Sequence, residues 1–217
     1  MANLTPSEAW RELREGNRRF VSSEMHNPQQ NVQRREETVQ GQNPKAILFG
    51  CSDSRVAAEI IFDQGIGDLF VVRTAGEIID STVLGSIEFA VSVLGTPLIV
   101  VLGHDSCGAV GAALNALDTG EIPAGFLRDV VEKIAPSILN GRRAGITERD
   151  ELGAEHAVEV GELLRERSVV INEALEAGKL AIASVTYKLV DGKAYLRSVI
   201  GDVEETPFPP GESAVVS

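Results

Sequence analysis

The sequence has little positive charge and no long apolar run. It contains 20 Lys and Arg residues against 32 Asp and Glu residues, which gives a formal net charge of −12. Nucleic acids are bound through clustered Lys and Arg, so a chain this acidic is not expected to bind them. No apolar stretch is long enough to span a bilayer. We therefore expect neither a nucleic acid nor a membrane as a partner.

Cysteine is also scarce, since Cys51 and Cys107 are the only two in 217 residues. The N-terminal sequence is charged and lacks the apolar region of a secretory signal, so we expect a cytoplasmic protein. In a reducing cytosol these two cysteines are not expected to form a structural disulfide. The chain is long enough to bury a core without disulfide bonds, so both thiols are available for metal binding or catalysis.

Apolar runs alternate with helical patterns from residue 45 onward. The runs at 45–50, 68–74 and 97–103 are short and continuously apolar, as in strands that are buried on both faces. A later stretch, 179–201, has the pattern of a hairpin around Asp191-Gly192. This order predicts an α/β fold with a mainly parallel central sheet, an antiparallel edge strand and flanking helices.

The chain divides into three segments of different composition. Residues 1–44 form an N-terminal helical arm, in which Thr5, Pro6 and Glu8 predict a helix start, and a short helix is expected near 34–39. Residues 45–200 form the α/β domain, and we treat the arm as part of it. Residues 201–217 form a Pro-rich C-terminal tail that is expected to be extended.

Chemically reactive side chains follow two of the three apolar runs. Cys51, Asp53 and Arg55 follow the first run in "CSDSRV", and His104 and Cys107 follow the third in "GHDSCG". Ligand sites of α/β sheets lie at the carboxyl ends of strands where the strand order reverses. If these two strands are neighbours, two thiols and an imidazole meet there. Such a set favours Zn²⁺ and leaves the fourth coordination position open.

The residues alone leave other interpretations open. A lone cysteine is often an inert small hydrophobe in a core. The two thiols could form a redox pair, although no C-x-x-C motif is present. Asp53 could close a purely structural zinc site as its fourth ligand. Asp105 is a candidate proton shuttle on proximity alone, and His156 is expected to be solvated on a polar helix.

The two signatures "CSDSRV" and "GHDSCGAV", in this order and at this separation, resemble those of the β-class carbonic anhydrases. The resemblance extends from the N-terminal helix to about Gly201. It implies a sheet with strand order 2-1-3-4 and one Zn²⁺ per subunit, bound by Cys51, His104 and Cys107. It also implies a homodimer or homotetramer in which the N-terminal helix embraces the partner subunit.

The resemblance implies a reaction as well, namely reversible hydration of CO₂ to bicarbonate and a proton by a zinc-bound hydroxide. Asp53 and Arg55 would be the catalytic dyad that controls the fourth coordination position, and in a closed state Asp53 itself would bind the zinc. Gln42 would bind a substrate oxygen. The apolar wall of the substrate pocket would consist of Phe70, Ala75, Phe89 and Gly108. For Phe70 and Phe89, periodicity alone predicts core packing instead.

One departure from the family pattern concerns a second, inhibitory bicarbonate site. Arg73 and Tyr187 match two of its residues, but Leu48 stands where the family has Trp, which argues against the site. Two other functions stay open from the sequence. A protein of this fold could hydrolyse another linear molecule such as carbon disulfide, or it could bind zinc without catalysis.

Overall fold

The strands of the computed structural model, which describes residues 4–207, form one sheet in the order β2-β1-β3-β4-β5. Strands β2, β1, β3 and β4 pair in parallel, and β5 pairs antiparallel with β4. The predicted sheet, its strand order and its antiparallel edge are confirmed. The strand bounds are β1 Ala46–Cys51, β2 Leu69–Thr74, β3 Leu98–His104, β4 Ala181–Tyr187 and β5 Ala194–Ile200.

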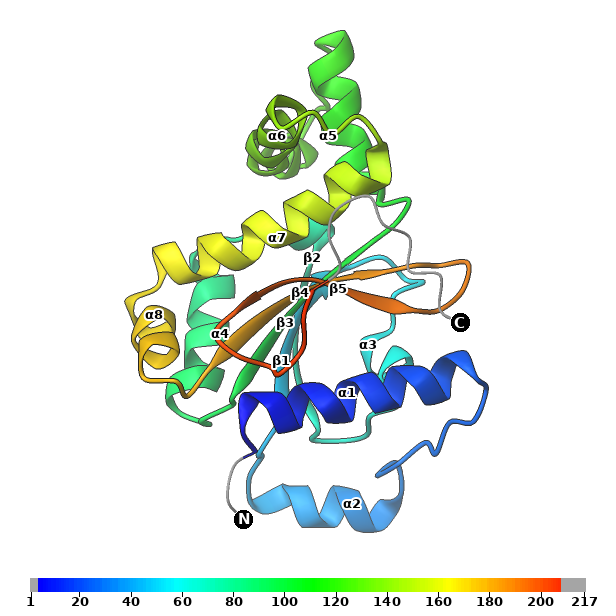
Figure 1. Ribbon diagram of the computed structural model, residues 1–217, viewed down its shortest axis with the longest axis vertical. Coiled ribbons are helices and arrows are strands. Elements are labelled where there is room, and N and C mark those ends of the chain that lie inside the picture. Colours follow the sequence, from blue (N-terminus) through cyan, green and yellow to red (C-terminus); the bar gives the residue numbers. More distant parts are fainter. Residues whose placement is uncertain (1–3, 208–217) are drawn as a thin grey trace.

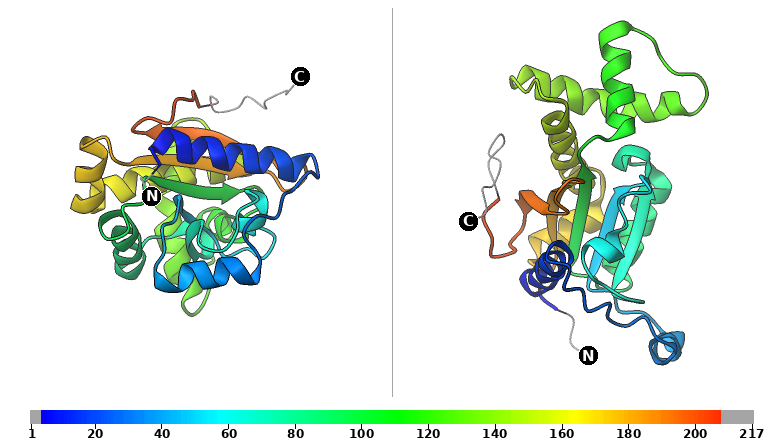
Figure 2. Two further views of the ribbon diagram at one scale, coloured as in Figure 1. Left: turned by 90° about the horizontal axis from the view of Figure 1, so that it is seen from below. Right: turned by 90° about the vertical axis from the view of Figure 1, so that its right-hand side faces the viewer.

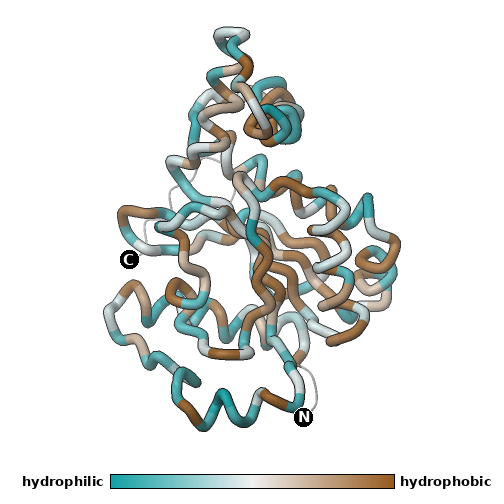
Figure 3. Tube along the Cα trace, turned by 180° about the vertical axis from the view of Figure 1, so that it is seen from behind, coloured by the Kyte–Doolittle hydropathy of each residue, from teal (hydrophilic) through white to brown (hydrophobic). Residues whose placement is uncertain are grey.

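The apolar runs are continuous because three strands are covered on both faces. Every residue of β1, β3 and β4 is buried. Successive side chains point to opposite faces, so Leu48 and Val100 belong to one core cluster and Phe49 and Val101 to another. The tube in Figure 3 shows these central strands as the most hydrophobic part of the chain.

Helices cover the two faces in separate groups, as Figures 1 and 2 show. Helices α1 and α3 pack on the Leu48 face, whereas α4, α7 and α8 pack on the Phe49 face. Helices α5 and α6 project beyond the sheet in Figure 1. The bounds are α1 Pro6–Val21, α2 Val32–Glu37, η1 Thr38–Gln40, α3 Ala58–Ile61, η2 Ala75–Glu77, α4 Ser81–Ser92, α5 Gly108–Thr119, α6 Leu127–Arg143, α7 Arg149–Arg167 and α8 Val169–Glu176.

Helix α1 begins as predicted and ties distant segments together. Thr5 and Glu8 form the expected capping box. The Asn17 amide donates to the carbonyls of Ile61, at 3.1 Å, and Gly192, at 2.9 Å, and accepts from the backbone N–H of Ala194 at 3.0 Å. These bonds join helix α1 to α3 and to the β4–β5 turn.

Several local predictions need adjustment. The short helix expected near 34–39 is divided into α2, Val32–Glu37, and η1, Thr38–Gln40. Residues 201–207 contain neither helix nor strand, as expected, and the rest of the Pro-rich tail lies outside the described residues. Among residues 4–207, no helix combines the length and the hydrophobicity that crossing a membrane requires.

Candidate metal centre

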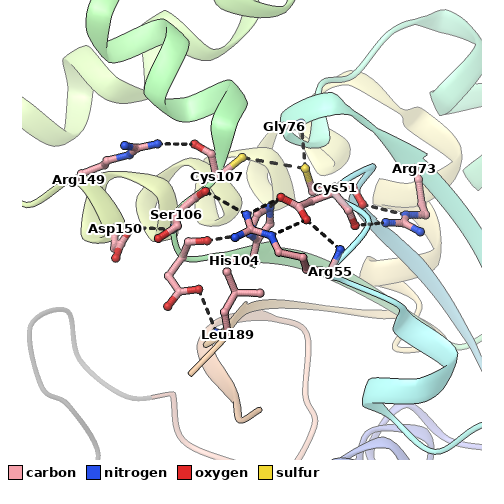
Figure 4. A network of polar contacts seen from close by, with 12 residues as sticks. Cys51, Arg55, Arg73, Gly76, His104, Ser106, Cys107, Arg149, Asp150 and Leu189 are labelled. Carbon is pink, nitrogen blue, oxygen red and sulfur yellow. Dashed lines mark hydrogen bonds and ion pairs between the residues drawn. The ribbon is translucent and has the colours of Figure 1, made fainter. Parts of the chain in front are cut away.

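Two neighbouring strands deliver the three predicted metal ligands to one point. Strands β1 and β3 are parallel, with Gly50 opposite Leu102, so Cys51 and His104 end their strands at the same edge of the sheet. The ligand atoms of Cys51, His104 and Cys107 all lie within 4.8 Å of one another, and all three residues are buried. Figure 4 shows the three side chains converging from the two loops.

The distances suit a tetrahedral zinc ion. The two Sγ atoms are 4.0 Å apart. Two sulfurs bound to one tetrahedral zinc, each at ~2.3 Å, lie ~3.8 Å apart. The donor set of two thiols and one imidazole is one that zinc accepts in proteins with a position left open. The cluster is therefore sized and equipped for this ion.

The imidazole of His104 also fits a metal ligand. Its Nδ1 lies 2.7 Å from the carbonyl oxygen of Asp105, and since a carbonyl only accepts, Nδ1 carries the proton. Nε2 then holds a bare lone pair. Within residues 4–207 this buried Nε2 atom has no hydrogen-bond partner. A buried acceptor without a partner is costly, and a bound metal ion would satisfy it.

The pKa values of the two thiols are shifted in opposite directions. A hydrogen bond with the Cys107 thiol lowers the pKa of Cys51, and the Gly76 N–H, 3.5 Å from Sγ, adds to the effect. The same Cys51–Cys107 bond, together with burial, raises the pKa of Cys107. Burial opposes protonation of His104, yet the Cys51 thiolate beside it raises the pKa of its imidazole. Cys51 is thus the thiol that ionises first.

Asp53 and Arg55 form a bidentate ion pair beside the ligands. Arg55 Nε donates to Asp53 Oδ1 at 2.9 Å, and Nη2 donates to Oδ2 at 2.7 Å. These bonds from Arg55 hold the pKa of Asp53 well below its usual range. Asp53 Oδ2 lies 3.9 Å from His104 Nε2. An ionised, oriented carboxylate therefore stands next to the atom that faces the metal position.

Each ligand loop is held by side chains from elsewhere. In the first ligand loop (residues 51–56), Arg73 of β2 donates to the carbonyls of Cys51, at 2.8 Å, and Asp53, at 2.7 Å. In the second ligand loop (residues 104–108), Arg149 of α7 donates to the Cys107 carbonyl at 2.9 Å. Asp150 accepts from the Ser106 N–H at 2.9 Å. Figure 4 shows both sets of bonds.

Comparison with known proteins identifies the family. Residues 46–194 match the family described as carbonic anhydrase. The chain belongs to the β-class carbonic anhydrases. It is 57% identical over 205 residues to a carbonic anhydrase of Mycolicibacterium smegmatis, with 94% of this chain and 100% of that protein covered. It is equally identical to carbonic anhydrase 2 of Mycobacterium tuberculosis, with 94% and 99% covered.

Solved structures of β-carbonic anhydrases have the same fold. The β-carbonic anhydrase CcaA superimposes with a TM-score of 0.68 at 26% identity, covering 88% of this chain and 85% of that one. A tetrameric β-carbonic anhydrase of Sordaria macrospora gives a TM-score of 0.68 at 23% identity, with 87% and 96% covered, and shows the fold alone. Family membership makes this chain an enzyme.

Not every residue that the carbonic anhydrase resemblance assigned to the substrate pocket lies beside the metal ligands. Ala75 follows Thr74, which pairs with Cys51, and Gly108 follows Cys107. Phe70 instead pairs with Ile47 near the start of β1 and stacks at 6.3 Å between ring centroids on Phe89, which is 44% exposed. Periodicity had predicted both rings for the core, and this is wrong for Phe89.

Gln42 lies at the opposite edge of the sheet from the candidate metal ligands. It precedes β1, at the amino edge of the sheet, whereas Cys51 ends β1. Six strand residues at ~3.3 Å each separate the two edges by about 20 Å. Gln42 lines a surface cavity there together with Arg34 and Lys45. One chain alone therefore does not bring Gln42 to the metal centre.

Two polar residues differ from their expected surroundings. His156 was expected to be solvated, but only 2% of it is exposed, because it lies on the face of α7 that packs inward. Leu152 and Val160, four residues away on either side, are buried too, so the helical spacing is that of a buried face. Asp105 accepts from the Leu189 N–H at 3.0 Å, so it orients the second ligand loop.

The residues that matched an inhibitory bicarbonate site have other contacts here. Arg73 donates to backbone carbonyls of the first ligand loop, as described above. Tyr187 is buried at the end of β4, and Leu48 is buried within β1. The absence of Trp at position 48 and these contacts both argue against that site.

Proposed function

We propose that this chain is a zinc-dependent carbonic anhydrase that interconverts CO₂ and bicarbonate with release of a proton. The observation that carries the proposal is the buried Cys51–His104–Cys107 cluster with its unpartnered imidazole nitrogen, in a chain of the carbonic anhydrase family. Each subunit would hold one Zn²⁺ through these three residues. When bound, zinc acidifies water and so supplies a nucleophile for CO₂ near neutral pH.

Asp53 and Arg55 would prepare that nucleophile. Asp53, kept ionised by Arg55, accepts a hydrogen bond from the attacking oxygen and aims its lone pair at CO₂. In the observed conformation Arg55 holds both carboxylate oxygens, so Asp53 would leave the fourth coordination position of a bound zinc open. Release from Arg55 would let Asp53 bind the metal and close the site. Binding of Asp53 to the metal would compete with binding of the attacking oxygen and would be favoured at low pH. The rate of CO₂ hydration should therefore increase as pH rises.

The position of Gln42 supports an assembly of at least two chains. Gln42 lies about 20 Å from its own metal ligands along β1, so it would meet substrate only in the site of a second copy. Phe70 and Phe89 at the β2 edge would be covered in the same way. We therefore propose a homodimer or homotetramer, as in the tetrameric relative of Sordaria macrospora.

The test is stopped-flow CO₂ hydration with zinc content measured on the same sample. Activity should disappear when a chelator removes zinc and return with Zn²⁺ but not Mg²⁺. Asp53→Ala should retain zinc and lose most hydration activity, whereas Asp129→Ala, which removes an exposed carboxylate on α6, should leave the rate unchanged. A fully active zinc-free protein would show that hydration does not require zinc. A fully active Asp53→Ala variant would show that Asp53 has no catalytic role.

A further inference from the structure

A buried histidine lies behind the metal centre and takes no part in the proposed chemistry. His156 of α7 places Nε2 2.8 Å from the carbonyl oxygen of Gly76 and Nδ1 2.6 Å from Ser137 Oγ of α6. His156 and Ser137 are each only 2% exposed. The pair has the spacing of a nucleophile and its base, but substrate has no access to either side chain. The contact of His156 that leads towards the metal ligands is the one with Gly76.

The partners of His156 fix its protonation. A carbonyl oxygen only accepts, so Nε2 must carry a proton and donate it to Gly76. Burial lowers the pKa of His156, which keeps the ring neutral and leaves Nδ1 as an acceptor. The Ser137 hydroxyl lies 2.6 Å from Nδ1 and 3.2 Å from the Ile134 carbonyl, and we assign its one proton to the shorter contact. Ser137, His156 and the Gly76 carbonyl thus form one directed chain of hydrogen bonds from α6 through α7 to η2.

The peptide segment that His156 holds also touches a metal ligand. The N–H of Gly76 donates to Cys51 Sγ at 3.5 Å, and the carbonyl of the same residue accepts from His156. Gly76 and Glu77 both adopt left-handed backbone conformations, with φ of 68° and 49°. Such a conformation is costly for Glu77. It needs support from its surroundings, and His156 supplies it.

Packing leaves this segment little freedom to shift. A Cβ added at Gly76 would lie 2.6 Å from Ile134 Cδ1 and 2.8 Å from the Cβ of Ala109. The segment is therefore enclosed by α5 and α6 as well as tied to α7. Its amide direction, and hence the N–H···S bond to Cys51, depends on these contacts.

We propose that His156 is a positioning residue for the metal centre: through the Gly76 carbonyl it aims the Gly76 N–H at the Cys51 sulfur. The inference rests on the proposed zinc site but does not depend on the rate of CO₂ hydration. A hydrogen bond to a thiolate ligand withdraws electron density from the sulfur and fixes its orientation. Loss of His156 should therefore alter the metal–sulfur bond while the protein retains its fold.

The first test uses the unaltered protein loaded with an NMR-active cadmium isotope. If the Gly76 N–H bonds to a metal-bound sulfur, its amide proton should show scalar coupling to cadmium across the hydrogen bond. The imidazole nitrogens of His156 should show the proton on Nε2. Absence of the Gly76 coupling, or a proton on Nδ1 of His156, overturns the proposal whether or not any variant folds.

The second test compares variants loaded with Co²⁺ or Zn²⁺. His156→Leu removes the donor to Gly76, so the sulfur-to-cobalt charge-transfer band should move to lower energy and zinc should pass to a chelator about 10-fold faster. His156→Gln retains a donor at a similar reach and should restore both readouts towards those of the unaltered protein. A normal band and normal release rate in His156→Leu overturn the proposal.

A matched control separates positioning from packing. Val160 lies one turn along the same buried face of α7 and is 2% exposed. Val160→Ala should lower the melting temperature but leave the charge-transfer band and zinc release unchanged. If it changes both readouts as His156→Leu does, the effect is one of general packing and the proposal is wrong.

The outcome also distinguishes this inference from the proposed function. A protein that binds no zinc, or binds it without hydrating CO₂, contradicts the proposed function. A protein that binds zinc and hydrates CO₂, yet shows no Gly76–cadmium coupling, contradicts only the role of His156.

Discussion

The two ligand loops reach the same metal position by different means. The first ligand loop, residues 51–56, is fastened by its own Arg55 and by Arg73 of the adjacent strand, and none of its residues has a positive φ. The second ligand loop, residues 104–108, contains left-handed Ser106, with φ of 53°, and is fastened by α7. The Leu189 N–H in the β4–β5 turn holds it as well, through Asp105.

The two loops differ in how far along the chain their supporting residues lie. The side-chain bonds to backbone carbonyls of the first ligand loop come from Arg73, which is 22 residues from Cys51 and 20 from Asp53. Those of the second come from 42 to 84 residues away. The first loop depends on two adjacent strands, whereas the second depends on helix α7 and the β4–β5 turn being in place.

The largest expected effect tests whether the loops are equal as ligand donors. Cys51→Ser and Cys107→Ser should each lower zinc affinity by more than about 100-fold, beyond the usual cost of losing a residue that only orients a ligand. Hydration should fall to background in both. Zinc content after dialysis against a chelator measures the effect. Retention of zinc by either variant would show that the substituted cysteine is not a metal ligand.

A second comparison addresses the arginines that fasten the loops. Arg73→Met removes bonds to two carbonyls of the first loop, whereas Arg149→Met removes one bond to the second. We expect hydration to fall about 100-fold for Arg73→Met and about 10-fold for Arg149→Met. Stopped-flow assays on zinc-saturated protein measure both. The reverse order would mean that the second loop is the less rigid one.

The third prediction concerns pH and the first loop. The pKa of Asp53 is lowered in the folded protein by Arg55, so the ionised carboxylate stabilises the fold above its unfolded pKa of about 4. This stability is lost as pH falls through the folded pKa. In metal-free protein, Arg55→Met should therefore lower the free energy of unfolding at pH 7 more than at pH 3. Urea titrations at both pH values measure the difference.

An equal effect of Arg55→Met at the two pH values would show that Arg55 acts through packing and not through the ion pair with Asp53.

The smallest expected effect concerns the backbone of the second loop. Ser106→Gly should raise the free energy of unfolding by up to ~1 kcal/mol, because relief of left-handed strain exceeds the extra entropy of glycine in the unfolded chain. Ser54→Gly is the matched control in the first loop, where φ is not positive, and should lower stability by ~0.5–1 kcal/mol. Chemical denaturation of both variants decides whether strain distinguishes the loops.

The sequence predicts the first loop better than the second. Continuous apolar runs identified β1 and β3, and the polar residues directly after them located the candidate metal ligands, which the structure brings together. Asp53 and Arg55 are two residues apart, so their pairing could be foreseen. Arg149 and Asp150 were not foreseen, because no local pattern shows where a distant helix will dock. His156 could have been placed, since it stands at four-residue spacing between buried Leu152 and Val160.

The positions of Phe89 and Gln42 in a single chain have a common physical origin. Phe89 has the helical spacing of a core residue, yet it lies on α4 next to the edge strand β2, where a single chain leaves its ring half covered. Gln42 lies near Cys51 in sequence, but an extended strand separates them. In the proposed assembly both residues would contact a second chain, and periodicity along one chain carries no information about such contacts.

The amide of Asn17 has a practical consequence for engineering. Its three bonds reach from helix α1 to the chain segments at Ile61, Gly192 and Ala194. Trimming the protein to the α/β domain alone would uncover those polar groups together with the apolar surface that Trp10 and Leu13 cover. Purification tags or surface-immobilisation linkers are therefore better attached ahead of this helix than put in its place.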